Sequence, residues 1–289
     1  MPVFFNCSGH DLPDYRKKSF DSFVVRNGHV ETSGWELHTC SKFAHDPKID
    51  LQGTFVFPAF ADAHTHFLQT ALMMVGCDLS HCSTLESVFQ TLETFARQNS
   101  DDWLLAWNLN ENELVEKRLP TVAELDRVIP RRKLWLSRVD LHSAIPNSAA
   151  LQWATSVLPD ACLENGRFIK STYVQLAGTL SASLPEPMKR LGLEKARHAA
   201  WAKGISTVHA LEGGGSSDFR DVELVSDFLS QPGFHGVVYH QNEDPSLAKK
   251  HSWPRLGGCL FVDGSFGSRT AALSQPYHDD PENHGVLYY

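Results

Sequence analysis

The chain has 289 residues, of which 42% are hydrophobic, and this suits one α/β barrel or a barrel plus a small accessory domain. Its formal net charge is −8 and it has no basic run, so we expect no nucleic-acid partner. Met1 to Lys18 lacks the order of a signal peptide, and no apolar run approaches the roughly 20 residues of a membrane span. We therefore expect a cytoplasmic protein without membrane contact, whose cysteines are thiols.

The predicted elements begin with a β region. Phe20 to Gly34 is typical of two short strands joined at Asn27-Gly28, a strong hairpin signal. A polar stretch follows, and then an apolar run from Thr54 to Phe60. We interpret residues 1–55 as part of a small β domain and residues 56–289 as the N-terminal part of a barrel.

Beyond residue 60, apolar runs alternate with helical patterns, which is the rhythm of βα units in a parallel sheet. The expected strands are 103–107, 134–138, 206–210, 236–240 and 259–263. The expected helices are 85–98, 121–128, 187–203 and 221–229. Thr121 with Glu124 three residues later, just after Pro120, predicts a capping box at the start of one helix.

One motif carries metal chemistry. His64 and His66 close the apolar run, and alternate residues of a strand face the same side, so both imidazoles project together. Zinc-type ions bind imidazole nitrogens in fixed directions, and barrel active sites form at the carboxyl ends of strands. Asp62 shares that face and could orient a ligand histidine as a hydrogen-bond acceptor. A lone His-x-His often ends a strand harmlessly, but Asp-x-His-x-His after an apolar run favours a metal site.

Two segments carry a family resemblance. Residues 57–67, FPAFADAHTHF, resemble the first barrel strand of the amidohydrolase superfamily, with Ala59 where a glycine is usual. Residues 263–273, DGSFGSRTAAL, resemble amidohydrolase family 3, whose members include N-substituted formamide deformylase. Weaker matches lie between them, at 138–143, 147–151 and 204–209.

The resemblance implies an α/β fold: an incomplete TIM-like barrel with part of a small N-terminal β-sandwich. It also implies one or two divalent metals, most simply Zn²⁺, which lower the pKa of a bound water and polarise the scissile carbonyl. In family 3 a lysine usually lies four residues before Asp-Gly-Ser, and here that position is Cys259. A thiolate is a good zinc ligand, so Cys259 is a candidate third ligand, and a buried core cysteine is an equally open alternative.

Further polar residues follow predicted strands and are candidates for contact with substrate. His142 lies in one of the weaker matching segments, and His209 and Glu212 lie at the end of the expected strand 206–210, where the glutamate could bind metal or substrate. Each also has a structural explanation, as a hydrogen-bonded strand end or a loop salt bridge. Asp263 and Arg269 belong to the most specific block. Arginine there could grip a carboxylate, or tie the loop to the barrel rim.

The family pattern continues beyond what this chain contains. Its later motifs include two His-containing strands and an aspartate that acts as general base, so the catalytic residue remains unknown and is expected beyond the chain end. We interpret the chain as a truncated product; a second chain supplying the rest, or a persistent half barrel, are the alternatives. An open barrel would expose apolar surface and favour self-association. We expect this chain alone to have little or no activity.

The sequence therefore predicts a metal-dependent hydrolase of carbon–nitrogen bonds other than peptide bonds, acting on a small amide-type substrate. A deaminase of the same superfamily is an alternative, although the Asp263–Leu273 block argues against it. A second alternative is a non-catalytic remnant or binding protein built on a decayed barrel. Tight stoichiometric zinc would favour the enzyme, and its absence would favour decay.

Overall fold

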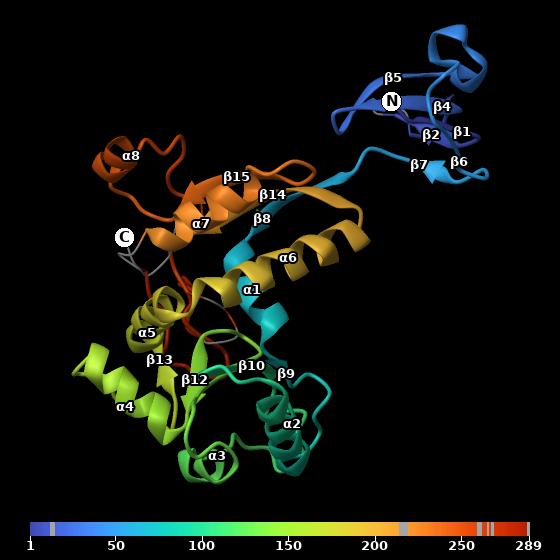
Figure 1. Ribbon diagram of the computed structural model, residues 1–289. Helices are drawn as coiled ribbons and strands as arrows, with labels where there is room; N and C mark the ends of the chain where they lie inside the picture. Colours follow the sequence, from blue (N-terminus) through green and yellow to red (C-terminus); the bar gives the residue numbers. More distant parts are fainter. Residues whose placement is uncertain (12–14, 214–218, 259–261, 265, 267–268, 288–289) are drawn as a thin grey trace.

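The computed structural model describes residues 1–11, 15–213, 219–258, 262–264, 266 and 269–287. Figure 1 shows a group of N-terminal strands set apart from a larger α/β body, to which an extended segment leads. Within the described residues the strands form four sheets, with the orders β5-β4-β1-β6, β3-β2-β7, β15-β14-β8 and β13-β12-β11-β10-β9. The last two sheets make up the larger body and carry most of the buried residues.

The N-terminal strands form two small sheets. Their bounds are β1 (Val3–Phe5), β2 (Ser8–His10), β3 (Lys18–Phe20), β4 (Ser22–Arg26), β5 (His29–Gly34), β6 (Lys48–Asp50) and β7 (Phe55–Val56). The hairpin expected at Asn27-Gly28 is confirmed: both residues have positive φ, and Arg26 pairs with His29 across the turn. A sandwich of these two sheets, and a domain boundary at residue 55, stay predictions.

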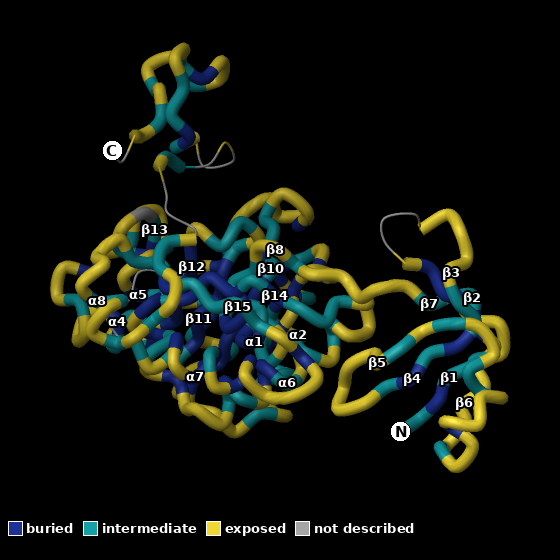
Figure 2. Tube along the Cα trace, turned by 90° about the horizontal axis from the view of Figure 1, so that it is seen from above, coloured by how far each residue is buried: buried dark blue, intermediate teal, exposed yellow. Residues whose placement is uncertain are grey.

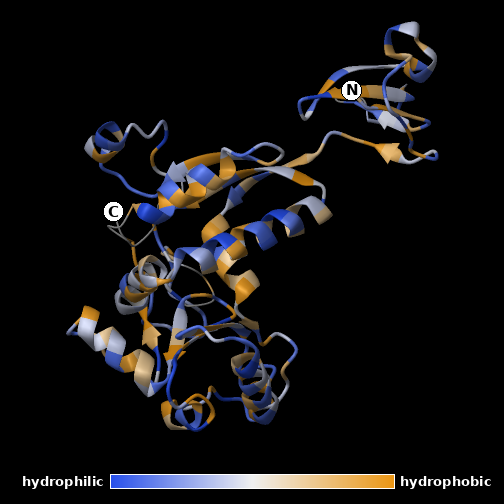
Figure 3. Cartoon of the chain, in the orientation of Figure 1, coloured by the Kyte–Doolittle hydropathy of each residue, from blue (hydrophilic) through white to orange (hydrophobic). Residues whose placement is uncertain are grey.

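The segment that leaves this region is apolar and exposed. Phe55, Phe57 and Phe60 are each more than half exposed, and Figure 3 colours β7 and the residues after it as hydrophobic. The ring of His10 stacks on that of Phe57, with centroids 4.9 Å apart. Exposed apolar side chains are stabilised when another apolar surface covers them, so association of two molecules would bury this segment. Self-association itself stays a prediction.

A parallel sheet of three strands holds the His-x-His motif. It consists of β8 (Phe60–Thr65), β14 (Ile205–Glu212) and β15 (His235–His240), with β14 in the centre. Helices α1 (Phe67–Val75), α6 (Glu186–Ala202) and α7 (Arg220–Leu229) pack on one face. The other helix of this part of the chain is α8 (Pro245–His251). Val208 and Ala210 of β14 face the helices and are buried, while His209 between them faces the opposite side.

The close packing of α1 on α6 depends on one glycine. A Cβ atom at Gly192 of α6 would lie 2.4 Å from the carbonyl oxygen of Ala71 in α1. The two helix backbones therefore approach more closely than any side chain at position 192 would allow. This contact fixes the middle of the helix that directly follows His66.

A second sheet lies between residues 77 and 169. It contains β9 (Cys77–Asp78), β10 (Trp103–Leu109), β11 (Lys133–Arg138), β12 (Ser143–Pro146) and β13 (Phe168–Ile169). Its helices are α2 (Leu85–Gln98), α3 (Val122–Val128), α4 (Ser148–Val157) and α5 (Lys170–Ser183). Strands β9, β10 and β11 run parallel, and β12 and β13 are antiparallel additions.

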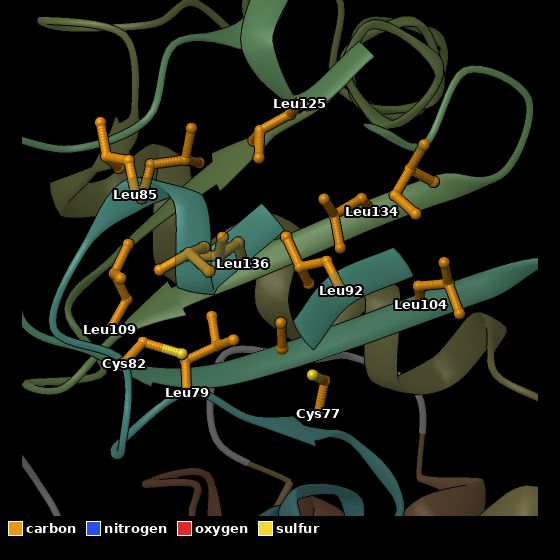
Figure 4. Packing of buried hydrophobic residues seen from close by; sticks show 14 of the residues in the cluster. Cys77, Leu79, Cys82, Leu85, Leu92, Leu104, Leu109, Leu125, Leu134 and Leu136 are labelled. Carbon is orange, nitrogen blue, oxygen red and sulfur yellow. The ribbon is translucent and has the colours of Figure 1, made fainter. Parts of the chain in front are cut away.

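Among the described residues, β10 and β11 lie in a different sheet from β8, β14 and β15, whereas we expected βα units of a parallel sheet. Residues of α2 and α3 cover one face of β10 and β11, and residues of α4 and α5 cover the other face. Leu104 and Leu134 pack with α2 and α3, as Figure 4 shows, while Trp103 and Trp135 face α4 and α5. A strand buried on both faces is continuously apolar in sequence whichever sheet it joins. The barrel itself stays a prediction.

The predicted helices are confirmed with small shifts at their ends. The helix expected at 85–98 is α2 with the same bounds, and α3, α6 and α7 each begin or end within one residue of the predicted range. The capping box at Thr121 is present, because its hydroxyl accepts from the Glu124 backbone N–H at 3.2 Å and the Glu124 side chain accepts from the Thr121 backbone. A local capping signal such as this one can therefore be recognised directly in the sequence.

The described residues between 262 and 287 form mainly turns and bends, and Figure 2 shows this C-terminal part apart from the two large sheets. The strand expected at 259–263 falls largely outside the described residues; within the described part, Asp263 forms an antiparallel bridge with Leu287. Among the helices that the structure describes, none has the length and apolar character needed to cross a bilayer.

Candidate metal and substrate site

The carboxyl ends of β8, β14 and β15 meet at one edge of their sheet. Thr65 pairs with Ala210, and Glu212 pairs with His240, so the residues that close each strand are neighbours. Parallel strands bring together at this edge side chains that are far apart in the sequence. The residues gathered here are His64, His66, Leu211, Glu212, His240 and Gln241.

His64 and His66 lie together as predicted. Their ring centroids are 5.5 Å apart at an interplanar angle of 77°. His64 is exposed and His66 is half-buried, since β8 ends at Thr65 and His66 forms the cap of α1. Asp62 acts on the backbone, where its Oδ1 accepts from the His64 N–H at 3.1 Å. The role that we expected for Asp62, orienting an imidazole ring, stays a prediction.

The imidazole of His66 is held by the ends of the two neighbouring strands. Its Nδ1 lies 3.1 Å from the carbonyl oxygen of Leu211, and the side chain of Gln241 also hydrogen-bonds the ring. A carbonyl can only accept, so Nδ1 carries a proton and Nε2 has the lone pair. Burial lowers the pKa of His66, and the nearby His64 lowers it further, while the two hydrogen bonds oppose the shift. The neutral ring is the form that binds a metal.

The side chain of Glu212 has different surroundings from those we expected. Its side chain is 5% exposed, and its Oε1 accepts a hydrogen bond from the backbone N–H of Leu68 at 3.1 Å. Burial raises its pKa to about 8, the backbone donors of Leu68 and Phe67 oppose this, and the charge of Asp221 adds to the rise. The burial of this carboxyl and its hydrogen bonds to backbone amides argue against the substrate contact that we expected for Glu212.

Two more histidines flank this edge. The Nδ1 of His209 lies 3.1 Å from the hydroxyl of Tyr239, so its ring has a hydrogen-bond partner on the next strand. His240 is 1% exposed and packs against Trp253 with centroids 4.3 Å apart. Among the described residues neither of its ring nitrogens has a hydrogen-bond partner, and burial together with His251 lowers its pKa. Contact of His209 with substrate stays a prediction.

His142 is exposed and lies after β11, in the second sheet and not at the edge that holds His64. Its backbone N–H donates to Asp140, and Asp140 in turn accepts from Arg138 at 2.6 Å. Arg138 also forms two hydrogen bonds with Glu111, at 3.0 and 2.6 Å. Burial lowers the pKa of Arg138, but these carboxylates outweigh it and raise the pKa. Sequence reasoning missed this network, although Arg138 and Asp140 lay in a matching segment.

The residues of the C-terminal block make local contacts. Asp263 Oδ2 accepts a hydrogen bond at 2.9 Å from the backbone N–H of Ala272, nine residues further along the chain. Arg269 forms an exposed ion pair with Asp279 at 2.8 Å, so its guanidinium contacts a residue of the same C-terminal part of the chain. Contact of either residue with substrate stays a prediction. Cys259, the candidate third ligand, lies outside the described residues.

The histidine pair fits part of a metal site. Structural and catalytic zinc sites need at least three protein ligands, and among the described residues no group of three His, Cys, Asp or Glu side chains converges. His66 nevertheless has the arrangement typical of a ligand, because a carbonyl fixes one ring nitrogen and leaves the other to coordinate. Two imidazoles at the carboxyl end of a strand therefore fit part of a divalent metal site, and further ligands would be needed to complete its coordination.

Comparison with known proteins places the chain in a family. The sequence model of the amidohydrolase family matches residues 48–287. YtcJ of Bacillus subtilis (strain 168), a protein named as an amidohydrolase, is 30% identical over 92% of this chain and 55% of its own length. N-substituted formamide deformylase of Arthrobacter pascens is 30% identical over 48% of this chain and 26% of its own length. The chain thus belongs to the amidohydrolase family, and the resemblance to family 3 is confirmed.

The fold has solved counterparts. The chain superimposes on a metal-dependent hydrolase of Pyrococcus horikoshii with a TM-score of 0.75 and 20% identity, covering 100% of this chain and 60% of that one. At this identity the likeness concerns the fold alone. It supports an α/β architecture for this chain. The chain spans about half the length of YtcJ.

Proposed function

We propose that this chain contributes the first metal ligands of a metal-dependent hydrolase that acts on carbon–nitrogen bonds other than peptide bonds. The observation that carries the proposal is the pair His64 and His66 at the carboxyl end of β8, with the His66 ring held at Nδ1 by the Leu211 carbonyl. Membership of the amidohydrolase family supports hydrolysis as the reaction class.

The substrate is a small amide-type molecule, and the metal is zinc, as one ion or two. The name of the relative N-substituted formamide deformylase supports a formamide or related amide. A divalent metal at such a site lowers the pKa of a water and polarises the scissile carbonyl. The role of this chain is to hold two neutral imidazoles in place, and the lowered pKa of His66 favours the neutral form of its ring. We propose Cys259 as a further ligand.

Zinc binding by the purified protein tests the proposal. Wild type is compared with His64→Ala and His66→Ala by calorimetric titration and by metal content after dialysis. His45→Ala is the control, because His45 is exposed and lies in the N-terminal region. We expect both site variants to lose at least about tenfold in zinc affinity, since each removes one ligand. Cys259→Ala should lower the bound metal as sharply.

Site variants that bind zinc like wild type would overturn the metal role of β8. A wild type with no stoichiometric zinc would favour the alternative, a non-catalytic binding protein built on a decayed barrel. Turnover is measured in parallel with N-substituted formamides and simple amides. Activity that a chelator abolishes and zinc restores would support the hydrolase and refute our expectation that these 289 residues alone are inactive.

A further inference from the structure

The first turn of α1 begins directly at the proposed metal ligands. His66 is the N-cap residue of this nine-residue helix, and its own side chain forms no capping hydrogen bond. The first N–H groups of a helix have no partner within the helix and need acceptors from elsewhere. The backbone N–H of Leu68 donates to Glu212 Oε1 at 3.1 Å, and the N–H of Phe67 is also hydrogen-bonded to this carboxyl.

The carboxyl group comes from a distant part of the chain. Glu212 is separated from Leu68 by 144 residues and closes the central strand β14. It lies at the start of α1, where the first backbone N–H groups of the helix need acceptors from outside the helix. The residue before it, Leu211, supplies the carbonyl that holds Nδ1 of His66. Two consecutive residues of β14 thus hold both the backbone and the ring of the same histidine.

We propose that Glu212 is a positioning residue for the metal site, which orients His66 by capping α1 and never contacts substrate. This inference rests on the proposed function, since it assigns Glu212 to the same site. The geometry explains why a polar side chain is buried here: its oxygens meet backbone N–H groups that would otherwise be unsatisfied. The close contact between Gly192 and Ala71 holds the middle of α1, and the hydrogen bonds from the Phe67 and Leu68 N–H groups to Glu212 hold its first turn.

The test compares variants that keep or remove the acceptor. Glu212→Gln retains an oxygen of the same reach, whereas Glu212→Asp is shorter by one methylene and Glu212→Leu has no acceptor. Glu223→Gln, on the exposed side of α7, is the matched control. Co²⁺ is titrated as the metal probe, and its visible absorption reports the ligand geometry. We expect Glu212→Gln to bind Co²⁺ with an affinity within about twofold of wild type. We expect Glu212→Asp and Glu212→Leu to lose about 10- to 100-fold in affinity and to show an altered spectrum.

A measurement without metal makes the test independent of loading. Nitrogen-15 spectra of the imidazoles show which nitrogen of His66 carries the proton. Wild type and Glu212→Gln should show the proton on Nδ1, and Glu212→Asp and Glu212→Leu should show a mixture of tautomers. Circular dichroism identifies the variants that remain folded; if Glu212→Leu unfolds, the comparison of Glu212→Asp with Glu212→Gln decides. A merely structural residue would change stability without changing the tautomer.

The two proposals fail in different ways. If His64→Ala and His66→Ala leave Co²⁺ binding unchanged, the metal site is wrong, and the nitrogen-15 spectra alone then decide the role of Glu212. If the histidine variants lose Co²⁺ but a folded Glu212→Asp or Glu212→Leu binds it like wild type with His66 still protonated at Nδ1, the positioning role is overturned. Loss of Co²⁺ affinity in Glu212→Asp and Glu212→Leu, together with wild-type affinity in Glu212→Gln, supports the positioning role.

Discussion

Replacement of Glu212 by glutamine should remove a specific pH dependence of stability. The pKa of Glu212 rises from 4.5 to about 8 in the folded chain, mainly because of burial. A carboxyl whose pKa is raised by folding binds its proton more tightly in the folded state. Its contribution to stability is therefore fully present below pH 4.5 and is lost as pH rises through 8. Glutamine mimics the protonated form and does not titrate.

The size of the effect follows from these two pKa values. Between about pH 5.5 and about pH 8, proton linkage predicts that wild type loses about 3 kcal/mol of unfolding free energy relative to Glu212→Gln. His66 and His240 also titrate, and because their pKa values are lowered they destabilise the fold as pH falls. Both proteins share these histidines, so the difference between the two curves isolates the carboxyl.

The assay is urea denaturation followed by far-ultraviolet circular dichroism at several pH values, with linear extrapolation to water. The exposed variant Glu223→Gln serves as the control and should follow wild type at every pH. A difference between wild type and Glu212→Gln that stays constant across this range would refute the reasoning. It would mean that Glu212 remains charged in the folded protein, with donors strong enough to offset its burial.

Three other substitutions test buried and exposed polar contacts elsewhere in the fold, and all three are measured by thermal and urea denaturation. Asn147→Ala should cost about 3 kcal/mol or more, because this fully buried amide donates to two carbonyls and accepts from two backbone N–H groups; a loss below about 1 kcal/mol would contradict this. Lys189→Met should cost about 3 kcal/mol, since it leaves the partly buried carboxylate of Asp221 without its ion pair at 2.6 Å and, among the described residues, with only the hydroxyl of Ser181 donating to it from a side chain. Arg97→Ala breaks an exposed pair with Glu93 and should cost no more than about 0.5 kcal/mol, and equal losses in the two would show that burial does not matter here.

Local features could be predicted from the sequence because neighbouring residues produce them. The hairpin at Asn27-Gly28 needs positive φ at two adjacent residues, and the capping box at Thr121 needs only Glu124 three positions later. The pairing of His64 with His66 follows from the two-residue period of a strand. The family also follows from sequence, since its motifs span most of the chain.

What the sequence could not decide was which strands share a sheet and which polar groups meet. An apolar run such as Trp103–Trp107 signals burial on both faces but carries no information about its neighbours, so β10 and β11 joined a sheet of their own. The partners of His66 are a backbone carbonyl 145 residues away and the side chain of Gln241. A carbonyl leaves no trace in the residue type, although a polar residue just after a predicted strand end could have drawn attention to Gln241.

Glu212 shows the same division most clearly. Its place at the end of a predicted strand correctly put it at the edge of the sheet that holds the histidines. Whether it faces a ligand or the start of α1 depends on where that helix packs, and this is set by the approach of α1 to α6 at Gly192. The sequence by itself determined the strand, the histidine pair and the family. Only the tertiary structure, by bringing β14 against the start of α1, decided that the carboxyl turns inward to the backbone.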